Sequence, residues 1–111
     1  VISRDDIEAV MVDEDDTVLG VRQLSQLGYL SEPHAAVAYK ALKRSLHQGE
    51  YGIFLGTAHP AKFKEQVENI LGTPLALPEA LARCAAEQGL SKDIPADFAA
   101  LQQELLKLEQ A

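Results

Sequence analysis

The chain has 111 residues, of which 47% are apolar, and it carries a formal net charge of −7. This apolar fraction excludes a disordered tail and predicts one small domain with a modest core, so we expect residues 1–111 to form a single unit without an internal boundary. The acidic balance and the lack of a basic stripe argue against nucleic acid and anionic membranes as partners.

The single cysteine and the first residues bear on cellular location and completeness. Cys84 cannot form an internal disulfide, which fits a reducing compartment, and its alanine-rich helical surroundings predict a small packed residue. With no signal peptide and no long apolar run, we expect a cytoplasmic protein. The chain does not begin with methionine, and Val1 and Ile2 are typical of the end of a buried strand. We therefore expect a fragment of a larger protein.

The first helical pattern is predicted to begin at Arg4, with Ser3 as its N-cap. It is interrupted at residues 13–16 and resumes over residues 18–27 with apolar residues at three-residue steps. This predicts either one long helix or two shorter ones, closed by Gly28.

The interruption is the acidic run Asp13-Glu14-Asp15-Asp16. A calcium-binding loop beginning at Asp13 is disfavoured, because its sixth position is Val18, where the sharp turn needs glycine. A solvated turn or helix face is the favoured interpretation.

A second helix is predicted to open at Glu32-Pro33, with Ser31 as a candidate cap and the proline in the first turn. It continues to Gln48-Gly49, with cations in its C-terminal half, as the helix dipole favours. Its apolar face consists of Ala35, Ala38, Leu42 and Leu46.

Residues 51–57 are the one predicted strand. The run Ile53-Phe54-Leu55 is short and continuously apolar, which is typical of a strand covered on both faces in a parallel sheet. Three further helices are predicted, over residues 60–72, 78–88 and about 96–109. We therefore expect a mainly helical fragment, with four to six helices around this one strand.

The segment from Gly56 to Phe63 is the candidate site. It places Thr57 at the carboxyl end of the predicted strand and directly before a helix, where ligands bind in open α/β sheets. Because Gly56 has no side chain, a neighbouring group could approach the backbone closely there. The Thr57 hydroxyl could bond to a neutral ring nitrogen. The alternative is a plain strand-to-helix junction, with Thr57 or His59 as a helix cap.

Other polar residues in the chain give weaker signals. Lys62 lies in the first turn of a predicted helix, where the helix dipole disfavours a positive charge. Its position could therefore reflect a functional role. His59 could act as a base or as a cap, and Glu32-Pro33-His34 could be a second site or a simple helix start. No metal-ligand spacing, glycine-rich phosphate loop or Ser-His-Asp order occurs.

Several stretches together resemble the C-terminal part of bacterial threonine synthases. The resemblance covers most of residues 27–101, and its longest and most specific part is residues 54–65. The stretches are Leu27-Gly28-Tyr29, Ser31 to Tyr39, Gly49 to Gly52, Phe54 to Glu65, Leu75 to Pro78 and Pro95 to Leu101.

This resemblance implies a pyridoxal phosphate enzyme with the fold of the tryptophan synthase β chain. It also implies conversion of O-phosphohomoserine and water into threonine and phosphate. Thr57 would face the pyridine nitrogen of the cofactor, and a neutral hydroxyl there would leave that nitrogen largely unprotonated. Glu32, His34 and His59 would lie at the active-site wall. The Schiff-base lysine would be upstream rather than Lys62, so the fragment alone would be inactive.

A second hypothesis is a small acidic interaction or regulatory domain that shares only the motif. Under either hypothesis, the apolar run Ile53-Phe54-Leu55 predicts self-association through surface that a missing sheet would cover.

Overall fold

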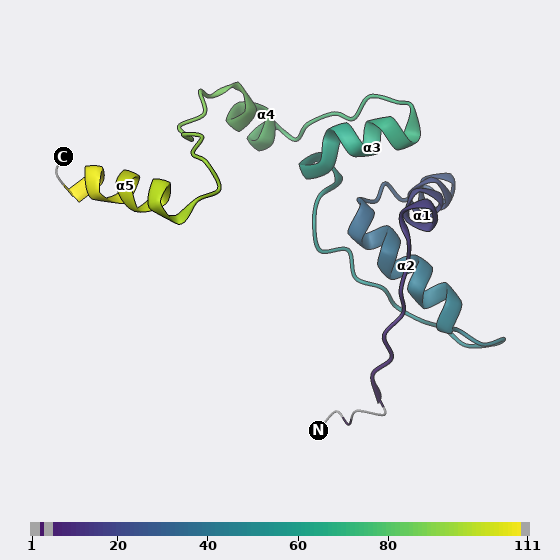
Figure 1. Ribbon diagram of the computed structural model, residues 1–111. Helices are drawn as coiled ribbons and strands as arrows, with labels where there is room; N and C mark the ends of the chain where they lie inside the picture. Colours follow the sequence, from purple (N-terminus) through teal and green to yellow (C-terminus); the bar gives the residue numbers. More distant parts are fainter. Residues whose placement is uncertain (1–2, 4–5, 110–111) are drawn as a thin grey trace.

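The computed structural model describes residue 3 and residues 6–109, and within them it contains five α-helices and one 3₁₀ helix (Figure 1). A mainly helical chain with four to six helices is therefore confirmed. The elements are α1 (Glu14–Gln26), α2 (Pro33–Ser45), the 3₁₀ helix η2 (Pro60–Phe63), α3 (Lys64–Leu71), α4 (Glu79–Ala86) and α5 (Phe98–Glu109).

The acidic run begins helix α1 instead of interrupting a helix. The Asp13 carboxylate accepts a hydrogen bond from the backbone N–H of Asp16 at 2.8 Å, so Asp13 is the N-cap. The three acidic residues that follow lie in the first turn, where the helix dipole favours negative charge. The predicted start at Arg4 lies outside the described residues, and residues 7–13 are not helical. Within the described residues, this pattern forms one helix, α1, which begins where the interruption was predicted.

Helices α1 and α2 cross closely because small residues face each other at the contact. A Cβ atom added at Gly20 would lie 3.2 Å from the Cβ of Ala36. Val21, Leu24 and Ala36 form the buried core cluster beside this contact. At its edge, the Asp16 carboxylate pairs with Arg44 and, at 3.4 Å, with Lys40 of α2.

Helix α3 completes this cluster of three helices (Figure 1). Val67 is fully buried, and Ile70 and Leu71 pack against the core. The Arg22 side chain of α1 donates to the backbone oxygen of Ile70 at 3.2 Å. Gly72 ends the helix in the left-handed region with φ of 68°, as its position in the sequence predicted.

The strand predicted over residues 51–57 is wrong. The segment is extended, but within the described residues it belongs to no sheet. Only Phe54 packs inward, with its ring against Tyr29 and Tyr39 at centroid distances of 6.1 and 5.7 Å. Ile53 and Leu55 are exposed instead of covered. A strand needs a neighbour to bond to, and the described residues supply none.

Helices α4 and α5 extend away from the three-helix cluster (Figure 1). The radius of gyration is 20.0 Å, whereas a compact chain of this length would have about 13 Å. Helix α4 has no buried residue, and Cys84, predicted to be packed, is exposed. The apolar stripe of α5 is likewise exposed. No helix among the described residues is long and apolar enough to cross a membrane.

Candidate functional site

Glu32 is a buried carboxylate that caps helix α2. The residue is only 1% exposed. One carboxylate oxygen accepts from the backbone N–H of Ala35 at 2.7 Å, and the other accepts from the backbone N–H of His34 at 2.8 Å. Glu32 therefore takes the capping position that the sequence had suggested for Ser31, whose buried hydroxyl has no hydrogen-bond partner among the described residues.

The ionised form of Glu32 is favoured despite its burial. Burial alone raises the pKa of the carboxyl group. The hydrogen bonds from the backbone N–H of His34, from the His34 ring and from the N–H of Ala35 together outweigh burial and leave the pKa below its ordinary value. The site thus holds a fixed negative charge beneath the first turn of α2.

The His34 ring is hydrogen-bonded to this carboxylate and extends toward the protein surface. Its Nδ1 atom is 2.6 Å from the second carboxylate oxygen of Glu32, while 68% of the side chain is exposed. The ring also packs against Phe63, with centroids 5.1 Å apart and planes tilted by 57°. Phe63 ends η2, so this contact joins the start of α2 to the segment that follows Thr57.

A second contact places Gly56, the residue before Thr57, beside the N-terminal end of α2. A Cβ atom added at Gly56 would lie 2.7 Å from the hydroxyl of Tyr29 and 4.0 Å from the Cβ of Ala35. The close approach expected at Gly56 is therefore confirmed, and its partner is Tyr29. Only glycine fits here without movement of the tyrosine.

The alternative interpretation of this segment, in which one of its residues caps a helix, is correct for His59. The Nδ1 atom of His59 accepts a hydrogen bond from the backbone N–H of Ala61 at 3.1 Å and caps η2. Thr57 is exposed, and within the described residues its hydroxyl has no hydrogen-bond partner. The threonine hydroxyl therefore remains available to a group from outside this chain.

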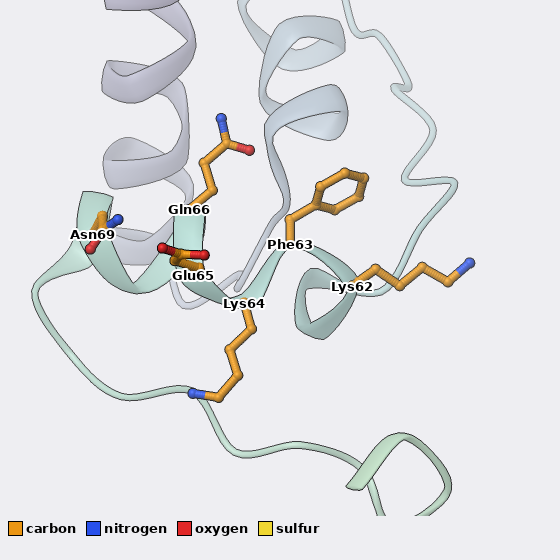
Figure 2. Close-up of a pocket in the computed structure, with 6 residues that line it drawn as sticks. All are labelled: Lys62, Phe63, Lys64, Glu65, Gln66 and Asn69. Atoms are coloured by element: carbon orange, nitrogen blue, oxygen red, sulfur yellow. The ribbon is translucent and has the colours of Figure 1, made fainter. Parts of the chain in front are cut away.

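Lys62 lies within η2, directly before Phe63. Figure 2 shows a surface depression lined by residues 62–66 and Asn69, with Lys62 and Lys64 extending in different directions. Lys64 pairs with Glu68, whose pKa is lowered first by that lysine and then by the N–H of Leu75. Within the described part of the chain, no ion pair involves Lys62.

The structure thus gathers three of the four predicted site residues at one helix junction. Glu32 and His34 are hydrogen-bonded to each other, and His59 caps the short helix whose Phe63 packs against the His34 ring. Tyr29 was missed as a site residue, and Phe63, although it ends the candidate segment, was given no role in the site. Phe63 fitted the apolar face of a helix, and nothing in the pattern of Tyr29 connected it to a glycine 27 positions later.

Comparisons with known proteins identify the class to which this fold and junction belong. A family model described as the C-terminal region of threonine synthase matches residues 35–104. The crystal structure of threonine synthase from Escherichia coli matches with a TM-score of 0.79 at 58% identity, over 87% of this chain and 23% of that one. The fold is therefore that of the C-terminal region of a much longer enzyme.

Sequence relatives agree with this assignment. Threonine synthase from Escherichia coli strain K12 is 59% identical over 95 residues, which is 86% of this chain and 22% of the relative. Threonine synthase from Serratia marcescens is 55% identical over 97 residues, 87% of this chain and 23% of the relative. The chain belongs to the threonine synthase family, and it spans less than a quarter of the length of these relatives.

Proposed function

We propose that this chain works as the C-terminal part of a cytoplasmic, pyridoxal phosphate-dependent threonine synthase. The complete enzyme would be a lyase that converts O-phosphohomoserine and water into threonine and phosphate, and the chain alone would be inactive. The observation that carries the proposal is the structural match to the Escherichia coli enzyme, which extends over 87% of this chain.

The residues present fit the cofactor at one point. Bound pyridoxal phosphate would supply an electron-withdrawing ring that stabilises negative charge on the substrate carbons. Thr57 offers an exposed hydroxyl that no described residue occupies, and a neutral hydroxyl is a suitable partner for an unprotonated pyridine nitrogen. Gly56, immediately before it, lies close to the hydroxyl of Tyr29. Thr57 would therefore orient the ring, while its covalent anchor would come from another part of the enzyme.

The partner for the exposed apolar surface would be the remainder of the same enzyme. Ile53 is 88% exposed and Phe98 is 77% exposed, although both are large apolar side chains. The relatives contain more than three quarters of their length outside the matched region. That additional chain would cover the two residues, and burial of each would contribute about 1.5–3 kcal/mol.

A chimera tests the proposed function directly. The matched C-terminal region of Escherichia coli threonine synthase is replaced by this chain, and threonine formation from O-phosphohomoserine is measured. We expect activity within about tenfold of the parent enzyme, because 59% of the matched residues are identical. The parent enzyme truncated before this region is the negative control. A soluble, cofactor-loaded chimera without activity would contradict the proposal.

Two substitutions at Thr57 test its role in that chimera. Thr57→Ser keeps the hydroxyl, whereas Thr57→Val keeps the shape and removes it. We expect the valine variant to lose activity about tenfold or more and to shift the absorbance of the bound cofactor, because the ring nitrogen loses its partner. The serine variant is expected to keep both properties. Equal behaviour of the two variants would exclude the hydroxyl as the ring contact.

A further inference from the structure

The pair of Glu32 and His34 has a geometry that determines where the histidine carries its proton. The Glu32 carboxylate is ionised and can only accept hydrogen bonds. A ring nitrogen at 2.6 Å from it must therefore be a donor, so Nδ1 carries a hydrogen whether the ring is neutral or charged.

This leaves Nε2 as the nitrogen of His34 that gains or loses a proton. In the neutral ring Nε2 holds a lone pair, and no described residue donates to it. The side chain is 68% exposed, and Phe63 holds one face of the ring. The lone pair is thus fixed in position and open to a group from outside the chain.

His59 provides a contrast on the neighbouring segment. Its Nδ1 accepts the N–H of Ala61, so Nδ1 carries no proton while the cap is intact. The neutral ring of His59 therefore has its hydrogen on Nε2. The two histidines at this junction present opposite chemistry at the same ring atom: His34 offers an acceptor and His59 offers a donor.

We propose that Glu32 is a positioning residue that locks His34 in the Nδ1–H form, so that Nε2 accepts a hydrogen bond from an O–H or N–H group in the active site. The role in catalysis rests on the proposed function, since a substrate amino group or a water molecule would be the donor. The lock itself depends only on the contacts within this chain. It also explains a buried carboxylate at a position where an uncharged cap would suffice for the helix.

Nitrogen-15 NMR of this chain, labelled at histidine, tests the lock without any activity. Protonated and unprotonated ring nitrogens resonate far apart, and correlations to the ring carbon-bound hydrogens distinguish Nδ1 from Nε2. At a pH where the rings are neutral, we expect His34 as the Nδ1–H form and His59 as the Nε2–H form. His47, whose ring makes no hydrogen bond or ion pair with a carboxylate among the described residues, is the internal reference for exchange between the two forms. A His34 signal that resembles the His47 signal would overturn the inference.

Glu32→Leu tests whether the carboxylate is the cause. Leucine has a similar size but no acceptor, so the Nδ1–H of His34 loses its partner. We expect the His34 ring to lose its single form, while the His59 spectrum, which does not depend on Glu32, stays unchanged and shows that the junction remains folded. Retention of the Nδ1–H form in this variant would assign the lock to something else.

The chimera tests whether the fixed Nδ1–H form of His34 contributes to activity. His34→Asn retains an N–H donor near the position of Nδ1 and removes Nε2, whereas His47→Asn makes the same change at an exposed histidine away from the junction. We expect about a tenfold or greater loss of kcat/KM for His34→Asn, which corresponds to one lost hydrogen bond near a charged group, and no loss for His47→Asn. Activity within twofold of the unsubstituted chimera would overturn the role of Nε2. An inactive unsubstituted chimera would instead count against the proposed function, and the NMR result would still decide the lock.

Discussion

The three-helix cluster of residues 14–71 and the arm of residues 79–109 are both helical, yet they use their apolar residues in opposite ways. In the cluster, Val21 and Val67 are fully buried. In the arm, Phe98 and Leu108 remain 77% and 73% exposed. The same helical periodicity therefore produces a core in one region and an uncovered face in the other. The difference shows that periodicity identifies the face that must be covered, but not what covers it.

Local interactions at the helix ends are similar in the two regions. Asp13 caps α1, and Asp97 accepts from the N–H of Ala100 in the first turn of α5 at 3.1 Å. Glu104 of the arm pairs with Lys107 and Lys92, which lower its pKa in that order. Exposed pairs of this kind contribute little to stability, so the arm depends on burial that this chain does not provide.

The largest expected effect comes from truncating the core of the cluster. Leu24→Ala is expected to lower the free energy of unfolding by about 2–4 kcal/mol, because Leu24 is only 3% exposed and its loss leaves a cavity. Leu105→Ala is the matched change in the arm, where the side chain is 54% exposed, and we expect about 0.5 kcal/mol or less. Urea unfolding followed by circular dichroism measures both. Equal losses would remove the distinction between the two regions.

Acid is expected to destabilise the cluster through Glu32. The pKa of Glu32 is lowered in the folded state from the ordinary value of 4.5, so its contribution is complete above that pH and is lost as the pH falls through the lowered value. Glu32→Gln should cost about 1–3 kcal/mol at pH 7 and flatten the loss of stability in acid. Thermal melting across the acid range measures both effects. Glu8→Gln, at an exposed position outside the helices, should leave the melting temperature at pH 7 unchanged.

A smaller effect is expected where the extended segment crosses the cluster. Gly56→Ala places a Cβ atom only 2.7 Å from the Tyr29 hydroxyl and should cost about 1–2 kcal/mol. Tyr29→Phe removes the hydroxyl, after which the nearest remaining ring atom is 3.9 Å away. The double variant should therefore recover most of the lost stability in urea unfolding. A cost that the second substitution does not reduce would mean that the segment packs differently.

The smallest effect on folding, but a clear effect on association, is expected in the arm. The chain alone should self-associate through its exposed apolar face. Leu105→Glu should weaken this association with little change in the unfolding of the cluster. Gln102→Glu adds the same charge at a polar position of α5 and is the control. Light scattering across a concentration series measures the change, and a monomeric parent chain would contradict the expectation.

The sequence predicted the helices well because caps, glycine stops and apolar periodicity are local signals. Pro33 at the start of α2 and Gly72 at the end of α3 are both where the pattern placed them. The error at residues 51–57 has a different origin. Three consecutive apolar residues indicate burial on two faces, but whether the covering layers belong to the same chain cannot be read from the run itself.

The candidate site was predicted only as separate residues. The resemblance singled out Glu32, His34, Thr57 and His59, yet the hydrogen bond between Glu32 and His34 and the ring contact with Phe63 depend on how α2 and η2 meet. The acidic run was misjudged for the opposite reason: Asp13 obeys an ordinary local capping rule, but four acids together seemed to break the apolar pattern. The contacts within the candidate site were not predicted because they depend on long-range packing. The acidic run was misinterpreted because two local signals competed.

Amide hydrogen exchange by residue, in this chain alone and in the chimera, tests the central claim that the arm is completed by the rest of a threonine synthase. We expect the amides within helices α1, α2 and α3 to be protected in both samples, and those of residues 79–109 to exchange rapidly in the chain alone. In the chimera, the arm should gain about 100-fold or more in protection, because assembly buries its apolar face. Arm amides that are equally protected in both samples, or equally unprotected, would contradict the claim.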